Sequence, residues 1–539
     1  SGREREHLDL LTHHYTEAYV GAREQRGAEP DLERLRRRGF ELTLLASGDA
    51  RTLCCLEKGE RLAAAALELA VTPVERAQAR EARGLACFVA LASNKAWANW
   101  TEAIAIRQAE VPEDRLAIAR LCVLAVESIT RWSGTIERWA ETEADVEGTI
   151  ERGLTFAPDD SEELVRLLVG RALMPSYFPR DDSERIRRGR DDARRAAGVA
   201  RKLDRPDLLS AALDGASALE WVIGHFGSVV PFIGERLALL PRISNDMEVA
   251  DILNMASKNA LNIGRYREAL GHAQESVRRC KADIVRGWAL YALSWRGLAN
   301  FWLGRWADLA VDVAAADALM TREERVVPPY FASLHYAAAA LVAEVQGDSD
   351  TAQDLMLRLD RRDELTGFPN WSKAPLMVRV LVRRGDFTAA RERLDHPFFR
   401  VHREGKGFLL AADAELVAAA GDWSRAGPLA GAMRDFATEA GLEALPTHAD
   451  RLEGLAAHAQ GRTVEAVTLL RRAAEAFAAQ EARWEAGRTE LALAAALAET
   501  RDAAAARVAL GRARPLLEEL RSKAELAAAR ELEARLAPA

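Results

Sequence analysis

Apolar residues along this chain recur every three or four positions, and charged residues fill most of the positions between them. This spacing follows the turn of an α-helix, and the alternation of apolar and polar residues that marks a half-buried strand is not seen. The helical stretches end at residues that favour turns or helix caps, namely Gly, Pro, Asp and Asn. The pattern therefore predicts an all-α chain of short, consecutive helices.

One turn signature recurs along the chain: Gly, any residue, often an aromatic residue, two more residues, and then usually Ala. The copies begin at Gly224, Gly264, Gly304, Gly347, Gly385, Gly421 and Gly461. The intervals between them are 40, 40, 43, 38, 36 and 40 residues. A period of this length is typical of arrays that repeat one helix-turn-helix unit.

The residues of this signature have a direct physical role in ending one helix and beginning the next. A Gly after an apolar helical stretch can adopt the left-handed conformation that closes a helix. Asp386 and Asp422, which follow such glycines, are predicted to cap the next helix, and Tyr266, Phe387 and Trp423 are predicted to pack back across the helix pair. The small Ala allows close approach of the two helices. Stability is then expected to come from stacking neighbouring pairs.

Charge and cysteine content narrow the class of partner and the compartment. The 74 basic and 82 acidic residues give a net charge of −8, so we expect neither nucleic acid nor a membrane as a partner. No apolar run is long enough to cross a bilayer, and the first residues do not resemble a signal peptide. We therefore expect a cytoplasmic protein. Its five cysteines are expected to be reduced core residues, namely Cys54, Cys55, Cys87, Cys122 and Cys280.

The sequence lacks the motifs of common enzyme classes. Gly405-Lys406-Gly407 has neither the Ser or Thr nor the preceding Gly of a phosphate-binding loop, and metalloprotease, nucleophile-elbow and kinase signatures are missing. His13 and His14 are adjacent, so on a helix their side chains point about 100° apart and are poorly placed to share a metal ion. We therefore expect no enzyme activity, no cofactor and no metal site.

An aromatic stripe is the most distinctive local feature. Trp288, Trp295 and Trp302 are seven residues apart, so two helical turns return each side chain to nearly the same face. Such a stripe is either part of the core or a platform for a ligand, and the sequence leaves both interpretations open.

The turn signature resembles the inter-helix signature of tetratricopeptide repeats (TPR). Gly297 and Gly454, each seven residues before a turn glycine, match the small position in the first helix of that family. The resemblance implies an all-α fold, an α-solenoid in which antiparallel helix pairs form a right-handed superhelix. It implies degenerate N-terminal helical repeats at 1–204, TPR-like repeats at 205–500 and C-terminal capping helices at 501–539.

The long and degenerate repeats resemble the sensor regions of large bacterial signalling proteins, in which an ATPase module precedes the repeats. Class III cyclases, Ser/Thr kinases and LuxR-type activators of this build share that arrangement. The opening segment from Leu10 to Ala18 resembles the segment that follows the ATPase module there. The resemblance implies a regulatory role in signalling, with an adjoining ATPase or effector domain as a partner.

The resemblance also implies a concave groove, lined by the residues that lie 13, 10, 6, 3 and 2 positions before each turn glycine. At these positions the chain places amide, ammonium, guanidinium and aromatic side chains. Such groups suit a peptide backbone, a carboxylate or a sugar-like ligand. The residues predicted to bind are Asn254, Lys258, Asn262, Tyr291, Ser294, Trp302, Arg379 and Arg383.

Three functions stay open at this point. The first is a non-catalytic sensor or regulatory region that binds a protein or peptide partner, or a small-molecule ligand, in its groove and regulates a signalling effector. The second is a pure protein-interaction scaffold without a small ligand. The third is an enzyme whose site is assembled from scattered helices. A pocket with convergent titratable groups would favour the third function, and a smooth open groove would favour the scaffold.

Overall fold

The structure is a computed structural model that describes residues 7–25, 29–53, 55–90, 92–131, 143–178, 180, 182–279, 286–321, 325, 333–366, 373–397, 399, 403–500 and 502–537. Every regular element in these residues is a helix, so the all-α prediction is confirmed. No helix among them combines the length and the apolar character needed to span a membrane.

The chain divides into two compact units, which are described separately. Unit 1 comprises Ser1–Phe178, Ser183–Gly215 and Ala282–Gly287. Unit 2 comprises Pro179–Asp182, Ala216–Lys281 and Trp288–Ala539. The domain boundaries at residues 204 and 500 stay predictions.

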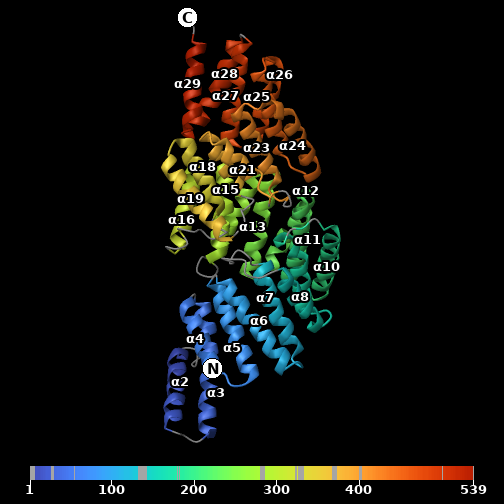
Figure 1. Cartoon of the computed structure of the whole chain (residues 1–539), viewed down its shortest axis with the longest axis vertical. Helices are drawn as coiled ribbons and strands as arrows, with labels where there is room; N and C mark the ends of the chain where they lie inside the picture. Colours follow the sequence, from blue (N-terminus) through green and yellow to red (C-terminus); the bar gives the residue numbers. More distant parts are fainter. Residues whose placement is uncertain are drawn as a thin grey trace. The chain divides into compact units, whose positions relative to one another are not determined.

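Successive helices of unit 1 pack side by side, and most of the described connections between them are short (Figure 1). Short connections make neighbouring helices antiparallel. The helices are α2 (Leu8–Glu24), α3 (Glu29–Thr52), α4 (Leu56–Leu69), α5 (Pro73–Val89), α6 (Ser93–Glu110), α7 (Arg115–Thr130), α8 (Glu143–Phe156), α9 (Glu162–Tyr177) and α10 (Ser183–Lys202), and α11 (Pro206–Ile223) begins in unit 1 and ends in unit 2.

Unit 2 continues the same arrangement with the repeats that carry the turn glycines. Its helices are α12 (Phe226–Leu239), η2 (Leu240–Arg242), α13 (Asp246–Ile263), α14 (Tyr266–Arg279), α15 (Arg286–Trp302), α16 (Trp306–Leu319), α18 (Ser333–Gln346), α19 (Ser349–Thr366), α20 (Ala374–Arg383), α21 (Phe387–Leu394), α23 (Lys406–Ala420), η4 (Trp423–Arg425), α24 (Ala426–Ala440), α25 (Leu445–Ala459), α26 (Thr463–Ala479), α27 (Arg483–Glu499), α28 (Ala503–Glu519) and α29 (Lys523–Leu536).

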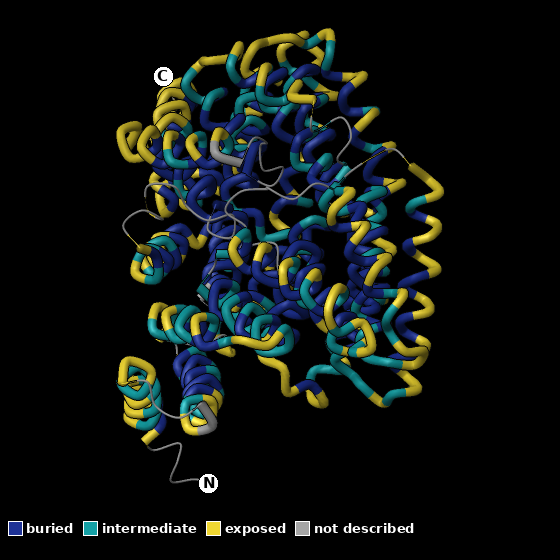
Figure 2. The backbone as a smooth tube through the Cα atoms, turned by 60° about the horizontal axis from the view of Figure 1, so that its bottom comes forward, coloured by how far each residue is buried: buried dark blue, intermediate teal, exposed yellow. Residues whose placement is uncertain are grey.

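The two helices of a pair differ in how they are buried. The first helix α13 is buried around nearly its whole surface, whereas its partner α14 buries positions three and four apart, such as Tyr266, Ala269 and Ala273. Figure 2 shows the same contrast between helices that are dark blue on most sides and helices that are yellow along one side. First helices therefore form an inner layer, and second helices cover it with one amphipathic face.

The predicted turn chemistry is confirmed at all seven turn glycines, whose φ angles lie between 67° and 102°. Asp386 caps α21 as predicted, because its carboxylate accepts a hydrogen bond from the backbone N–H of Ala389 at 3.0 Å. The prediction for Asp422 was wrong. Its side chain makes no cap to the following helix and instead accepts a hydrogen bond from the hydroxyl of Ser424 at 2.7 Å.

The aromatic residues of the turns behave differently from one another. Tyr266 is buried and stacks on Trp302, with 5.0 Å between ring centroids and 4° between planes. Phe387 is 36 % exposed, and its packing across the pair stays a prediction. Trp423 is half-buried. The Ala that ends the signature is buried in every described pair that has it, at Ala269, Ala352, Ala390, Ala426 and Ala466.

The cysteine prediction is confirmed in part. Cys87 and Cys122 are free and buried in unit 1, and burial raises the pKa of their thiols to about 11 and about 12. Cys55 is exposed directly before α4, so the prediction of a core position was wrong for it. Cys54 and Cys280 lie outside the described residues.

Within unit 2, the turns of early repeats rest on turns that come much later in the sequence. The backbone N–H of Glu443 donates to the carbonyl of Ile263 at 2.8 Å, and the side-chain amide of Gln346 donates to the carbonyl of Leu520 at 3.1 Å. The helix pairs of unit 2 therefore wind tightly enough for one set of turns to stack on the next. This winding decides what the inner surface can do.

The stacking gives Gly264 a second constraint besides its φ of 102°, because a Cβ there would lie 2.6 Å from the Cβ of Ala444. We expect Gly264→Ala to lower the free energy of unfolding by about 2–4 kcal/mol, from left-handed strain and overpacking together. The matched control is Gly461→Ala, where φ is 74° and no atom lies within 4 Å of the added Cβ. Strain alone gives a loss of about 1 kcal/mol there. Equal losses in chemical denaturation would contradict the stacked turns.

Candidate functional site

The predicted groove residues of unit 2 fall into two groups. The first group contacts residues that come more than a hundred positions later. Lys258 forms an ion pair with Glu404, and its ammonium lies 4.4 Å from the ring centroid of Trp221. Arg379 contacts Glu485 at 2.5 Å, and these positions are 106 residues apart. The surface predicted to be an open groove is thus in contact with later repeats of the same unit.

The second group makes contacts within its own or the neighbouring repeat. Asn254 accepts a hydrogen bond from the hydroxyl of Ser276 at 3.0 Å, and Ser294 lies 2.8 Å from Nδ1 of His335. Tyr291 packs between Trp288 and Trp295, with ring centroids 5.9 and 5.3 Å away. These side chains contact other residues of the protein. A binding role for them stays a prediction.

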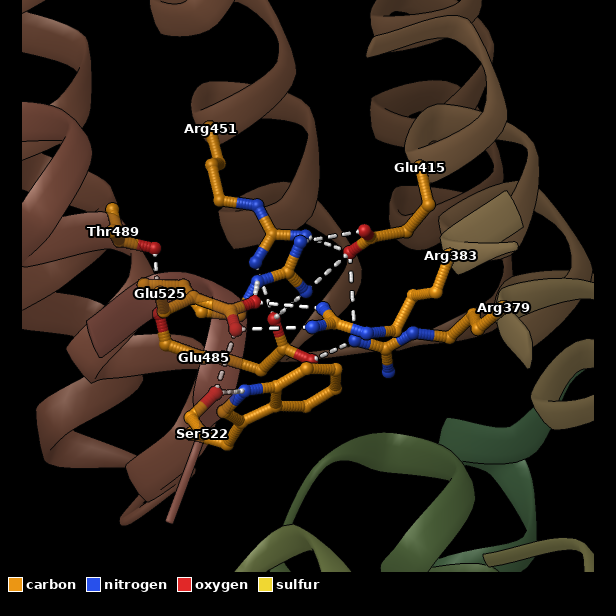
Figure 3. A network of polar contacts seen from close by, with 10 residues as sticks. Arg379, Arg383, Glu415, Arg451, Glu485, Thr489, Ser522 and Glu525 are labelled. Carbon is orange, nitrogen blue, oxygen red and sulfur yellow. Dashed lines mark hydrogen bonds and ion pairs between the residues drawn. The ribbon is translucent and has the colours of Figure 1, made fainter. Parts of the chain in front are cut away.

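Seven charged side chains from five helices meet on the inner side of unit 2, and we call them the axial cluster (Figure 3). They are Arg379, Arg383, Glu415, Arg451, Glu485, Arg488 and Glu525, contributed by α20, α23, α25, α27 and α29. All seven are at most about one-fifth exposed at the side chain, with Glu485 the most buried at 2 %.

The contacts of the axial cluster tie α20 to the C-terminal repeats. Arg451 bridges Glu415 and Glu485, and Arg488 contacts Glu415 at 2.7 Å. Arg383 reaches both carboxylate oxygens of Glu525, at 2.7 and 3.0 Å. Bidentate pairs of this kind combine strength with fixed geometry.

The cluster keeps its charges because attraction outweighs burial. Burial raises the pKa of Glu485, but the guanidiniums of Arg379 and Arg451 outweigh that effect and hold the pKa well below its usual range. Burial acts in the same way on Glu415, and Arg488 and its neighbours again lower the pKa well below the ordinary value. Burial also raises the pKa of Glu525, but Arg383 and Arg488 lower it below its ordinary value. The three carboxylates are therefore ionised at neutral pH, against four guanidiniums.

A small pocket adjoins the axial cluster. Its empty space, including the opening to solvent, is about 550 Å³. Within that space, about 20 Å³ is available to the centre of a water molecule. Its lining is mainly apolar, from residues such as Leu261, Trp295, Leu298, Trp302, Leu376 and Phe408, and the polar lining residues are Asn262, Arg379, Glu415 and His448. We call this the axial pocket.

Trp302 is the common neighbour of the groups that line the axial pocket. Its ring centroid lies 6.0 Å from that of Phe408 and 6.2 Å from that of His448, and the guanidinium carbon of Arg379 lies 5.9 Å away. The predicted residues Asn262, Trp302 and Arg379 are thus brought together here. The whole tryptophan stripe is buried, yet two of its members, Trp295 and Trp302, also line this pocket.

His448 is neutral in this setting, because burial, helped by the charge of Arg451, lowers its pKa to about 3. The pKa values of Glu415 and Glu485 lie well below their ordinary range, and the pKa of Arg488 is raised. General acid–base catalysis needs a pKa near the working pH. The convergent groups are therefore poised to bind or to hold the fold rather than to transfer protons.

Sequence reasoning missed the carboxylates of the cluster. Glu415 could have been found, because it precedes Gly421 by six residues, as Lys258 and Arg379 precede Gly264 and Gly385. Glu485 and Glu525 could not be found by this count. No turn glycine follows them at the offsets counted, and the turns that precede them use non-glycine residues with positive φ, Glu481 and Arg521.

No group of three or more potential metal ligands is found among the residues that the structure describes. A wider cleft of about 1090 Å³ lies between α16, α18 and α19, with the turn at Leu520–Arg521 at its edge. It is large enough for part of a partner protein, unlike the axial pocket.

Comparison with known proteins gives a likeness only at the level of structure. No family model and no curated protein matches the sequence. A chain of the APC/C hetero-tetramer Cut9–Hcn1 is similar over 99 % of this chain and 96 % of that chain, at 12 % identity and a TM-score of 0.50. The fold is a TPR-like α-solenoid.

Yeast Tom70 is matched over the same shares of the two chains, also at 12 % identity, but with a TM-score of 0.32. That score is too low to support an argument. At 12 % identity, the likeness to the Cut9–Hcn1 chain concerns the fold alone.

Buried histidines make unit 2 sensitive to pH. Burial lowers the pKa of both His335 and His448 from 6.5 to about 3. Below pH 6.5 the unfolded chain therefore binds protons that the folded chain does not, so stability is full above pH 6.5 and falls as pH drops toward 3. We expect a loss of about 1 kcal/mol per pH unit from each histidine between pH 6 and 5.

The measurement is the free energy of unfolding from chemical denaturation at pH 7, 6 and 5. His448→Gln should reduce the slope with pH by about half, and the double variant with His335→Gln should remove most of it. An unchanged slope in both variants would show that these histidines are not buried as described.

Proposed function

We propose that the chain is a non-catalytic regulatory scaffold, in which the inner surface of unit 2 controls how tightly its repeats are wound. Occupancy of the axial pocket, or engagement of a partner protein, shifts this winding and so changes the outer surface presented to an effector. A ligand can shift such an equilibrium only if it favours one winding over the other. The signalling context, including an adjoining ATPase or effector domain, is part of the proposal and rests on the sequence resemblance.

One observation carries the proposal: the side chains at groove positions join repeats that are far apart in sequence. The Arg379–Glu485, Arg383–Glu525 and Lys258–Glu404 pairs each connect an early repeat with a late one. Breaking or rearranging these ion pairs therefore directly affects the contacts between the stacked turns. The axial pocket is too small for a folded domain, so we assign protein partners to other surfaces such as the α16–α19 cleft.

A pure scaffold is the second candidate, and the likeness in fold to a chain of a multi-protein assembly supports it equally well. It differs from the regulatory proposal in one respect. In a pure scaffold, the axial cluster would serve stability only, and the winding would not respond to a local change in charge.

Amide hydrogen exchange at Glu443 distinguishes the two, because its N–H donates across the stacked turns to Ile263. We expect Glu485→Gln to leave Arg379 and Arg451 incompletely paired and to loosen the winding. The Glu443 amide should then exchange roughly 10-fold faster, while amides inside α13 keep their protection.

The matched control is Glu465→Gln, which removes an exposed ion pair with Arg462 outside the axial cluster and should leave the Glu443 rate unchanged. Equal exchange rates at Glu443 in both variants and the wild type would favour the pure scaffold. Loss of protection throughout unit 2 would mean that the cluster is needed for folding and not for regulated winding.

A further inference from the structure

Four buried polar atoms around the axial pocket lack hydrogen-bond partners in the described part of the chain. They are Nε1 of Trp295, Nε1 of Trp302, Nε of Arg379 and Nδ1 of His448. All four residues line the pocket and are at least nine-tenths buried. Three of these atoms carry hydrogen and can only donate. A buried donor without an acceptor costs roughly 1–3 kcal/mol, so this concentration calls for an explanation.

The charge of the axial cluster has the matching sign. Four guanidiniums share three carboxylates, so each guanidinium has a carboxylate partner but the cluster carries one net positive charge. A buried charge is stable only when it is paired. Unsatisfied donors and an excess cation in one place both call for an acceptor that carries a negative charge.

The lining of the pocket defines the rest of such a ligand. Apart from the polar groups, the walls are the faces of Trp302 and Phe408 and the side chains of Leu261, Leu298 and Leu376. The free space is small and mainly apolar in its lining, which favours a compact apolar body over a ligand with a large polar substituent. Arg379 supplies a planar, charged donor of the kind that recognises carboxylates.

We infer that the axial pocket binds a small organic acid, with its carboxylate at Arg379 and the tryptophan N–H groups and its apolar body along Trp302 and Phe408. This inference rests on the proposed function, since it names the ligand class whose binding would shift the winding. The carboxylate accepts hydrogen bonds from the N–H groups that lack partners, and it balances the net positive charge of the axial cluster. Its apolar part fills a space that water alone fills poorly.

The test is isothermal titration calorimetry of the full chain with benzoate as the probe and benzamide as its neutral isostere. We expect benzoate to bind with one-to-one stoichiometry and benzamide to bind at least 10-fold more weakly. Acetate, which lacks the apolar body, should also bind more weakly than benzoate. Equal affinity for benzoate and benzamide, or no detectable benzoate binding, would overturn the inference.

Two variants probe the site directly. Arg379→Gln should weaken benzoate binding by about 10- to 100-fold, and Trp302→Phe, which keeps a ring but removes the N–H, by about 3- to 10-fold. The matched control, Arg512→Gln, removes an arginine that pairs with Glu490 away from the pocket and should leave binding unchanged. Thermal midpoints without benzoate identify a variant that fails to fold. Should Arg379→Gln fail to fold, Trp302→Phe and benzamide still decide the matter.

Competing ligands are separate arms of the same titration. Tighter binding of chloride or inorganic phosphate than of benzoate would assign the site to an inorganic anion and contradict the inference. Tighter binding of acetyl-Ala-Ala-Phe would assign it to a peptide C-terminus, also against the inference. If benzoate binds but leaves Glu443 amide exchange unchanged, the ligand class stands and the regulated winding fails. If benzoate does not bind and Glu485→Gln still speeds Glu443 exchange, the regulated winding stands and the ligand class fails.

Discussion

The ion pairs between early and late repeats of unit 2 are the interaction on which the account of this protein depends. Taking charged groups out of water is expensive, and a buried pair recovers that cost only with good geometry and several partners. The axial cluster has both: Arg451 bridges two glutamates, and Arg383 holds Glu525 through two hydrogen bonds. Such pairs add little to stability compared with apolar residues, but they select one arrangement, because every other register leaves charges unpaired.

The same pairs limit how much of the concave inner surface of this repeat protein is accessible for binding. In an open solenoid, inner-helix side chains face water and are available to a peptide. In unit 2, Arg379 and Arg383 of an inner helix instead contact Glu485 and Glu525 of later repeats. What is left is a pocket of small volume beside the axial cluster, so recognition on this side of the molecule is limited to compact groups. Larger partners must use outer surfaces.

The sequence was sufficient for the local structure and insufficient for the winding. Turn glycines such as Gly264 can be recognised in the sequence, because the left-handed position after an apolar helical stretch is most often occupied by glycine. The same rule fails where Glu481 and Arg521 adopt positive φ. Glu485 and Glu525 were missed because no turn glycine follows them at the offsets counted. Counting back from the glycines found Arg379 and Trp302. Their partners depend on small rotations between repeats, which add up over the array and leave no local signal.

A double-mutant cycle on Arg383 and Glu525 tests the central claim most directly, since these residues are 142 positions apart and meet only if the repeats wind as described. The free energy of unfolding is measured for Arg383→Ala, Glu525→Ala and the double variant. The account predicts a coupling energy of about 1–3 kcal/mol, with the double variant destabilised by less than the two single losses together. Additivity within about 0.5 kcal/mol would mean that the two side chains do not meet, and that the inner surface of unit 2 is open.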